Sequence, residues 1–301
     1  MSVAAVVVSY NRVDLLRKCL SALQSQDRQP DEIILVDNGS TDGSVAMVRE
    51  EFPEVSVFET GANLGGAGGF AWGIEHAIAA GHDCAWLMDD DAEPLPGSLA
   101  PLVKAMESAT DRPGFVTSLV LNPEGSPNSG HLPDLTPAPE KQLTANALGG
   151  IAVDSASFVG VLIDLVAAAK MPLPYADFFI WFDDAEYTRR LSSSTFGMML
   201  PDSRISHPEK QNQTDMGGRL FYYIRNNLWR RRLDPAPRTL LQNPVRWAAG
   251  MAVLALRQGL AAEDRRLWLR SAGRGLYEGL VRSPRTIWPG QLLAKTVRLG
   301  D

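Results

Sequence analysis

The sequence predicts an α/β fold, in which a mainly parallel, doubly wound sheet is followed by a helical C-terminal region. Three observations support this prediction. Short apolar runs alternate with segments of helical periodicity through residues 3–91, which is the pattern of parallel strands joined by helices. Clusters of polar residues directly follow the strand-like runs. Beyond residue 217 the pattern becomes helical and rich in Arg and Trp.

The predicted strands are short runs of β-branched and aliphatic residues bounded by turn-forming residues. Nearly continuous apolar runs of this kind are typical of strands buried on both faces of a sheet. These runs cover residues 3–9, 32–36, 55–59 and 84–88, with further strand-like segments near residues 150–153 and 157–163.

The predicted helices carry apolar residues at intervals of three and four. The clearest covers residues 12–26, and others cover residues 44–51 and 70–80. Residues 178–191 begin as a loop and become helical. Residues 123–139 are rich in Pro, Gly and Ser, which predicts a flexible loop.

The composition is that of a folded, soluble protein. Of the 301 residues, 45% are hydrophobic and 21% are charged. Cys19 and Cys84 show neither zinc-ligand nor disulfide spacing, so we expect a reducing, cytoplasmic environment. The N-terminal apolar run is short and has no basic region before it, unlike a signal peptide. The longest apolar run, residues 247–256, is bracketed by Arg246 and Arg257 and is too short to cross a bilayer.

The net charge of −6 is distributed unevenly. Residues 217–301 hold 16 Arg and Lys against five Asp and Glu, whereas residues 1–216 hold 13 against 30. A basic region of net charge +11 beside a body of net charge −17 predicts contact with an anionic surface, such as phospholipid or a pyrophosphate.

The first candidate site is the run Asp89-Asp90-Asp91, which follows the fourth predicted strand. Alternation along a strand directs Asp89 and Asp91 to the same side. Two converging carboxylates suit a hard divalent ion such as Mg²⁺ or Mn²⁺, which would neutralise a diphosphate leaving group. The alternative is a solvated acidic turn. His207 is a candidate third ligand, although a lone histidine is more often structural.

The polar clusters at Asn11 and Asp37 also follow strand ends directly, so we expect them at the same edge of the sheet as Asp89 to Asp91. Asp37 begins the turn 37–43, where it can accept a hydrogen bond from an imide N–H such as that of uracil, or simply belong to an N-capped turn. Residues 61–69 contain five glycines, which favour close approach of the backbone to a ligand or form a mobile loop. They match neither the dinucleotide fingerprint nor the P-loop.

The last candidate site is the run Trp181-Phe182-Asp183-Asp184-Ala185-Glu186. A carboxylate beside aromatic side chains can act as the general base that deprotonates an acceptor hydroxyl. Acids at the start of a helix are also stabilised by the helix dipole. The run is therefore explained equally well by catalysis and by helix capping.

Together these motifs resemble the family 2 glycosyltransferases, which have the GT-A fold. The resemblance rests on residues 6–12, 37–42 and 89–91 and covers roughly the first 210 residues. A more specific resemblance within this family is to the galactofuranosyltransferases of actinobacterial cell-wall galactan. It rests on residues 63–70 and 181–186 and on His207. The short chain resembles the enzyme that initiates this polymer.

This resemblance implies inverting, metal-dependent transfer of galactofuranose from UDP-galactofuranose. The implied acceptor is a rhamnosyl-N-acetylglucosaminyl diphosphate carried on a polyprenol, and the implied cofactor is Mn²⁺ or Mg²⁺. The implied catalytic domain covers residues 1–216, with a nucleotide-sugar part at about 1–120 and an acceptor part at about 148–216. A basic helical region, 217–301, follows it.

The resemblance also implies roles for individual residues. Asp184 would be the base, although Asp183 beside it can exchange roles with it. Trp181 and Glu186 would contact the acceptor. The implied metal ligands are Asp89, Asp91 and His207. The residues implied to bind the nucleotide or the donor sugar are Ser9, Asn11, Arg12, Asp37, Asn63, Gly65, Gly66 and Asp90.

The basic C-terminal region, with its Trp and Arg residues, suits a monotopic surface on the inner face of the cell membrane, where a lipid-linked acceptor would be met. The alternative is a helical appendage with solvated Arg side chains. We expect no nucleic-acid partner, and the sequence leaves the oligomeric state open. Two other functions compete: a family 2 rhamnosyltransferase that uses a dTDP-sugar, and a nucleotide-sugar-binding scaffold without turnover.

Overall fold

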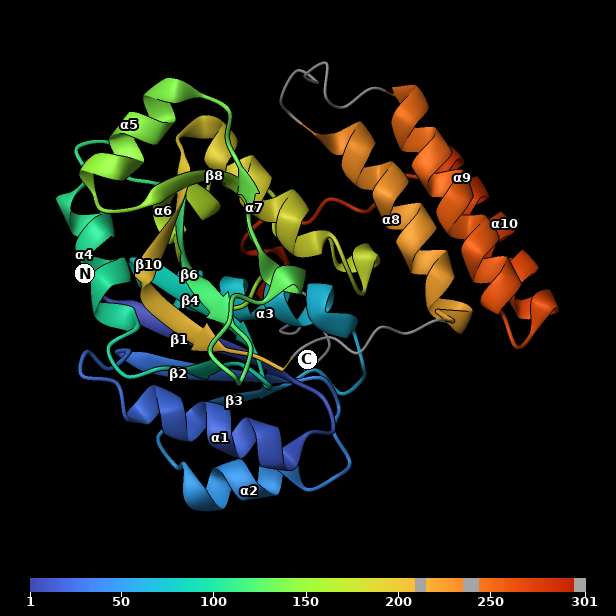
Figure 1. The fold of residues 1–301 in the computed structure, drawn as a ribbon. Helices are drawn as coiled ribbons and strands as arrows, with labels where there is room; N and C mark the ends of the chain where they lie inside the picture. The colour runs from blue at the N-terminus through green and yellow to red at the C-terminus, as the bar shows by residue number, and fades with distance from the viewer. Residues whose placement is uncertain (209–214, 235–243, 295–301) are drawn as a thin grey trace.

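The computed structural model describes residues 1–208, 215–234 and 244–294. One mixed sheet forms its centre, with helices on both faces, and three long helices stand together at one side (Figure 1). The described residues form a ten-stranded sheet in the order β3-β2-β1-β4-β9-β6-β10-β8-β7, with β5 paired to β10. The strands are β1 (Val3–Ser9), β2 (Glu32–Asp37), β3 (Ser56–Glu59), β4 (Cys84–Asp89), β5 (Glu93–Pro94), β6 (Phe115–Leu121), β7 (Asp134–Leu135), β8 (Ile151–Ser155), β9 (Val161–Asp164) and β10 (Gly197–Ser206).

The prediction of a mainly parallel α/β sheet is confirmed. β1 pairs in parallel with both β2 and β4, β2 pairs in parallel with β3, and β6 with β10. Only β5, β8 and β9 run against the other strands in the described sheet. Because β2, β1 and β4 are parallel neighbours, their carboxyl ends meet at one edge, as the polar clusters after them require.

Both faces of the sheet are covered by helices. Alternate side chains of β1 enter two separate apolar cores, and all of them are buried. One core is formed with α1 (Val13–Gln24), α2 (Ser44–Glu51) and α4 (Leu99–Ser108), and the other with α3 (Gly65–Ala79) and α7 (Asp183–Ser194). Figure 1 shows α1 and α2 on one side of the sheet and α3 on the other.

Helix α3 begins at Gly65, so the prediction of a glycine loop through residue 69 is wrong for its second half. The reason is close packing between helix and sheet. A Cβ atom at Gly69 would lie 2.4 Å from a methyl of Val8, and one at Gly73 would lie 2.2 Å from a methyl of Val6. Glycine therefore lets α3 approach β1, and this packing outweighs the low helix propensity of glycine.

Several elements were not predicted from the sequence. Strands β6 and β10 and helix α4 are among them, as is α5 (Pro139–Ala147). The region predicted as a flexible loop, 123–139, also contains the short helix η1 (Ser129–His131) and strand β7. The remaining short helices are α6 (Leu165–Ala168), η2 (Ala176–Phe178) and η3 (Gly217–Arg219).

The C-terminal region is helical, as predicted. It contains α8 (Leu220–Leu233), α9 (Pro244–Ala261) and α10 (Arg265–Val281). Among the described residues, no helix is both long and apolar enough to cross a membrane. The division of the chain at residue 216 remains a prediction.

After α10 the chain returns to helix α3 beside the central sheet. Glu75, buried on α3, accepts backbone hydrogen bonds from Gly290 (2.8 Å), Leu292 (3.2 Å) and Leu293 (3.3 Å). Leu292 joins the apolar core between α3 and the sheet. This segment therefore connects the helical region firmly to α3.

Candidate active site

A cavity of about 740 Å³ opens at the carboxyl ends of the parallel strands. It is lined by the ends of β1 and β4, the N-terminus of α3, the start of α7 and the end of β10. The predicted site residues that line it are Ser9, Arg12, Asn63, Gly65, Gly66, Asp89, Asp90, Asp91, Trp181, Asp183, Asp184 and His207. Segments distant in sequence therefore meet in one cavity, and Asn11, Asp37 and Glu186 lie outside its lining.

Asp89, Asp91 and His207 form a cluster suited to a metal ion. One ligand atom from each lies within 4.8 Å of the others. Asp89 ends β4, and His207 directly follows β10. This is an Asp-X-Asp arrangement completed by an imidazole, and oxygen and nitrogen donors of these types suit Mn²⁺ or Mg²⁺.

The hydrogen bonds of His207 also fit a metal ligand. Its Nδ1 lies 2.8 Å from the carbonyl oxygen of Pro208, which can only accept, so Nδ1 carries a proton. Nε2 lies 3.0 Å from Oδ1 of Asp91. In the neutral imidazole, Nε2 therefore directs its lone pair toward the carboxylates of this cluster, as a histidine that binds a metal does.

The charges in this cluster interact strongly. Burial and then the charges of Asp91 and Asp90 raise the pKa of Asp89 well above its ordinary value. Burial lowers the pKa of His207, but its hydrogen bond to Asp91 and the charges of Asp91 and Asp89 together outweigh burial and raise this pKa. Burial raises the pKa of Asp91, but the hydrogen bond from His207 and the charges of His207 and Arg12 together give a net lowering. Without a cation, the cluster therefore holds protons.

Asp90 points to the opposite side, toward β1 and the loop after it. Its carboxylate accepts hydrogen bonds from Ser9 Oγ (2.9 Å), the Tyr10 backbone N–H (3.2 Å) and Arg12 Nη1 (3.1 Å). The same Arg12 nitrogen lies 2.6 Å from Asp91. Burial raises the pKa of Asp90 to about 6 despite Arg12. Arg12 therefore links two of the three acids at the cavity floor.

Asp37 shapes the turn after β2. Its Oδ2 accepts the backbone N–H groups of Gly39 (3.0 Å) and Ser40 (2.9 Å), and its buried Oδ1 has no hydrogen-bond partner among the described residues. Asn11, at φ 53°, joins this turn through a bond from the Thr41 N–H to its side-chain oxygen (2.7 Å). One carboxylate oxygen of Asp37 is therefore used by the turn, and the other remains for a donor such as an imide.

The glycine-rich segment packs against a neighbouring loop and also lines the cavity. Asn63 accepts the Gly65 N–H (2.8 Å), and a Cβ atom at Gly65 would lie 2.0 Å from the carbonyl oxygen of Phe179. Gly66 lines the cavity, and a Cβ atom there would meet nothing within 4 Å. Gly65 is thus required by a neighbouring loop, whereas Gly66 leaves space open to a ligand.

The loop before α7 is held in an unusual conformation. Phe179, Trp181 and Phe182 have φ values of 64°, 67° and 70°. Residues with a Cβ atom rarely adopt this region; each one costs about 1–3 kcal/mol and persists only where its surroundings impose it. The loop delivers Trp181, Asp183 and Asp184 to the cavity. We call residues 177–184 the acid loop.

The two acids at the start of α7 have different surroundings. Asp183 is buried, and burial followed by the charge of Asp184 raises its pKa well above the ordinary value. Asp183 is close enough to the metal-ligand cluster to raise the pKa of Asp89. Asp184 is more exposed, and its Oδ1 accepts the Ala185 N–H (2.7 Å).

Glu186 faces away from the cavity. It is buried and pairs with Arg190 through two contacts of 2.8 and 3.0 Å. Arg190 in turn donates to the carbonyl oxygens of Pro172 and Leu173. Glu186 thus helps fix α7 in place, and its predicted contact with the acceptor stays a prediction.

Sequence reasoning missed some residues of the cavity. His131 was given no role, yet its ring centre lies 4.5 Å from that of His207 and its Nδ1 lies 3.0 Å from Ser157 Oγ. Arg219, just before α8, also lines the cavity and adds a cation. Both are brought there by tertiary packing of distant segments, for which the sequence carries no periodic signal.

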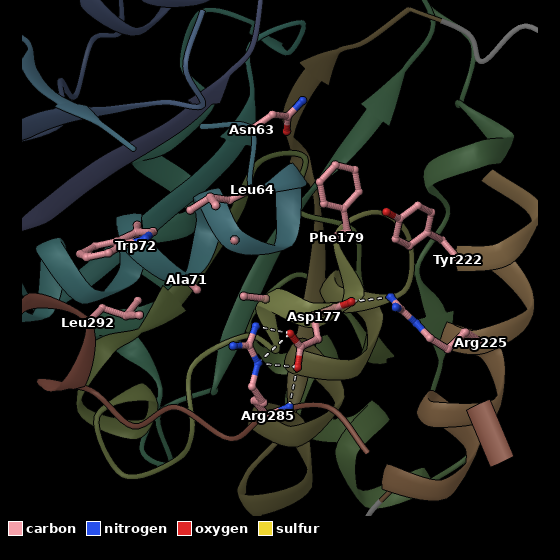
Figure 2. A pocket seen from close by; sticks show the side chains of 12 residues that line it. Asn63, Leu64, Ala71, Trp72, Asp177, Phe179, Tyr222, Arg225, Arg285 and Leu292 are labelled. Carbon is pink, nitrogen blue, oxygen red and sulfur yellow. Dashed lines mark hydrogen bonds and ion pairs between the residues drawn. The ribbon is translucent and has the colours of Figure 1, made fainter. Parts of the chain in front are cut away.

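A smaller cavity of about 310 Å³ adjoins the first one and shares Asn63 and Phe179 with it. Figure 2 shows it between α3, the start of the acid loop, α8 and the returning C-terminal segment. Asp177 pairs there with Arg285, with Oδ1 2.6 Å from Nη2. Parts of the catalytic and helical regions therefore meet beside the active cavity.

The family follows from comparison with known sequences. The sequence model described as Glycosyl transferase family 2 matches residues 4–165, more than half of the chain. The chain is a family 2 glycosyltransferase. This glycosyltransferase also shares its fold with two solved enzymes, which places it among GT-A proteins. They are "Crystal structure of GalNAc-T7 with UDP, GalNAc and Mn2+" (TM-score 0.58, 14% identity, 92% of this chain and 57% of that chain) and "Mannosyltransferase PcManGT from Pyrobaculum calidifontis in complex with GDP-Man and Mn2+" (TM-score 0.55, 17% identity, 99% and 80%).

Curated relatives lie within the same family. This glycosyltransferase is 30% identical over 300 residues to galactofuranosyltransferase GlfT1 of Mycolicibacterium smegmatis, covering 90% of this chain and 96% of the relative. GlfT1 of Mycobacterium tuberculosis (strain H37Rv) is 36% identical over 219 residues, covering 69% and 70%. N-acetylglucosaminyl-diphospho-decaprenol L-rhamnosyltransferase of the same strain is 30% identical over 148 residues, covering 43% and 45%.

Proposed function

We propose that this glycosyltransferase transfers galactofuranose from UDP-galactofuranose, with inversion, to a polyprenyl-diphosphate-linked rhamnosyl-N-acetylglucosamine, and so initiates cell-wall galactan. The observation that carries the proposal is the similarity to GlfT1 along almost the whole of both chains. The cavity adds support, because the metal-ligand candidates Asp89, Asp91 and His207 line the same cavity as residues of the acid loop.

The donor half of the cavity fits a nucleotide diphosphate held with a divalent ion. Asp89, Asp91 and His207 would hold the metal, which supplies Lewis-acid stabilisation of the diphosphate leaving group. The unpaired Oδ1 of Asp37 would accept the uracil imide N–H. Asp90 would contact the donor sugar, and Gly66 leaves room for the donor to approach the N-terminus of α3.

The acceptor half supplies the base. In a single displacement, Asp184 would take the proton of the acceptor hydroxyl as that oxygen attacks the anomeric carbon. Asp184 is the better exposed of the two acids, which favours contact with the acceptor. Asp183 is the alternative base, since its raised pKa makes it the stronger proton acceptor when ionised. Trp181 would shape the acceptor site.

The helical region supports placement on a membrane surface. Helix α9 packs inward through Trp247, Met251 and Leu254, whereas its opposite side exposes an apolar stripe. Val245, Leu256 and Leu260 of this stripe are 73%, 63% and 85% exposed. The described part of α9 has Arg residues beside the stripe and no acid. An apolar stripe flanked by Arg suits the interface of an anionic bilayer, where a lipid-linked acceptor resides.

A rhamnosyltransferase is the second candidate, because a rhamnosyltransferase acting on a lipid diphosphate is also similar to residues of this chain. A donor screen separates the two functions. The purified protein is incubated with Mn²⁺, a synthetic lipid-linked acceptor and either UDP-galactofuranose or dTDP-rhamnose, and release of the nucleoside diphosphate is followed. Acceptor-dependent release from UDP-galactofuranose alone supports the proposal. Release from dTDP-rhamnose alone replaces it, and release from neither favours a scaffold.

A further inference from the structure

We propose that Asn226 of α8 is a positioning residue, which holds the acid loop in its unusual conformation and so presents Asp183 and Asp184 to the acceptor. The inference rests on the proposed function for its link to catalysis. It concerns a residue in the helical region, outside every motif considered in the sequence.

Asn226 makes three backbone contacts with the acid loop. Its Nδ2 lies 2.9 Å from the carbonyl oxygen of Phe178, 2.8 Å from that of Ile180 and 3.1 Å from that of Trp181. The side chain is fully buried, with 0% exposure. The two hydrogens of one buried amide group are therefore shared among three carbonyl oxygens of one turn, and removing the group would leave these oxygens without this donor.

Arg225 orients this amide. Its Nε lies 3.0 Å from Oδ1 of Asn226, which fixes Nδ2 on the side of the loop. Its Nη2 donates to the carbonyl oxygens of Asp177 and Phe178. Figure 2 shows Arg225 extending from α8 to the backbone oxygen of Asp177. These two adjacent residues thus form hydrogen bonds with backbone carbonyl groups of the acid loop from its first residue to Trp181.

Aromatic packing from the same helix reinforces these bonds. Tyr222 stacks on Phe179 at 5.1 Å between ring centres, and Tyr223 meets both Trp181 (5.9 Å) and Phe182 (5.3 Å). The three residues that these rings contact are the residues of the acid loop with positive φ. An unfavourable backbone conformation persists only where its surroundings fix it, and here α8 contributes those surroundings.

The position of the acid loop explains why its fixed backbone conformation matters for sugar transfer. Asp183 and Asp184 end the acid loop and begin α7, so a change of the loop backbone before them moves both carboxylates. Among the described residues, Asn226 forms side-chain hydrogen bonds with the acid loop and with Arg225, and with neither Asp89 nor Asp91 on the donor side. Loss of Asn226 should therefore impair the chemistry and leave donor binding intact.

The test compares Asn226→Asp and Asn226→Ala with Asn227→Asp. Asn227 is the matched control, because its Nδ2 donates within α8, to the carbonyl oxygen of Tyr223 (3.2 Å), and to no residue of the acid loop. Three quantities are measured: kcat for transfer to the lipid-linked acceptor, the Kd for UDP with Mn²⁺, and amide hydrogen exchange of residues 177–184. We expect kcat to fall about 100-fold for both Asn226 variants, the scale of an approximately 1 Å misplacement of reacting groups. The Kd should stay unchanged, and exchange should rise in the acid loop alone.

Two results would overturn the inference. One is acid-loop exchange and kcat close to those of Asn227→Asp. The other is a parallel loss of UDP affinity and a rise of exchange throughout the protein, which would mean a general structural role. If the unaltered protein transfers no galactofuranose, the proposed function fails instead. The exchange of the acid loop and the Kd for UDP then still decide whether Asn226 positions the loop.

Discussion

At the scale of single residues, we expect the protonation of His207 to control metal binding by the cluster of Asp89, Asp91 and His207. Its Nδ1 is engaged by Pro208, and only Nε2 faces Asp91. We predict that His207→Ala weakens Mn²⁺ binding at least about tenfold, since loss of even an outer-shell partner costs 10–100-fold. Isothermal titration calorimetry measures this change. Unchanged affinity would remove His207 from the ligand set.

The same residue makes metal binding depend on pH. The raised pKa values of Asp89 and His207 mean that protons occupy these groups at higher pH than usual, and a metal ion must displace them. Mn²⁺ affinity should therefore rise with pH until the pH exceeds the raised pKa values of both groups, and binding below that pH should release protons. Calorimetry in two buffers of different ionisation enthalpy measures this release. A pH-independent affinity would contradict the assignment.

The acids at the start of α7 give a separate prediction. Asp184→Ala should keep UDP binding and lose transfer by about 10²–10⁴-fold, the usual contribution of a general base. Steady-state kinetics and UDP titration distinguish the two effects, with Asp183→Asn as the comparison. If Asp184→Ala turns over nearly normally while Asp183→Asn does not, Asp183 is the base.

Strand periodicity explains why part of this site was predictable. Asp89 and Asp91 were expected on one side because they are separated by one residue at the end of an apolar strand, and the structure brings them together. His131 and Asn226 carry no such local signal. They reach the cavity and the acid loop through the packing of η1 against the end of β10 and of α8 against the acid loop.

At the scale of elements, α3 shows how packing overrides propensity. Gly73→Ala should place a Cβ atom 2.2 Å from Val6 and destabilise the protein by about 1–3 kcal/mol, as overpacking does. Gly66→Ala, where a Cβ atom meets nothing within 4 Å, should be neutral or slightly stabilising. Urea denaturation of both variants measures the difference. Equal stability would mean that the approach of α3 to β1 does not require Gly73.

Strand β10 escaped prediction for a physical reason. Pro201-Asp202-Ser203 has the composition of a turn. In the structure the strand continues through it, because the pairing with β6 shifts register between Leu200 and Arg204. This irregularity accommodates the proline, and the strand continues to the position of His207. By contrast, β1, β2 and β4 were predictable because continuous burial makes their sequences uniformly apolar.

At the scale of the whole molecule, the C-terminal region combines two surfaces. Its inner surface meets the acid loop through α8, and its outer surface presents the apolar stripe of α9. The charge asymmetry along the chain was visible in the sequence, whereas the contact with the acid loop depends on tertiary structure. The proposed arrangement would place the acceptor site near the membrane.

The stripe gives a prediction for membrane binding. The double variant Leu256→Glu/Leu260→Glu should lower partitioning to vesicles of phosphatidylglycerol and phosphatidylcholine at least about tenfold, because each buried leucine contributes about 1.5–3 kcal/mol. Leu143→Glu is the matched control, since Leu143 is 75% exposed on α5, in the catalytic part. Vesicle sedimentation measures binding. Equal losses for both variants, or none, would exclude α9 as the membrane surface.

The central claim is the identity of the transferred sugar, and one measurement tests it most directly. The purified protein is incubated with Mn²⁺, UDP-galactofuranose and a lipid-linked rhamnosyl-N-acetylglucosamine acceptor, and the product is weighed by mass spectrometry. We predict a gain of one or two hexose units that disappears with Asp184→Ala. An unchanged acceptor mass, with UDP still bound in the presence of the metal, would contradict the proposed donor and acceptor.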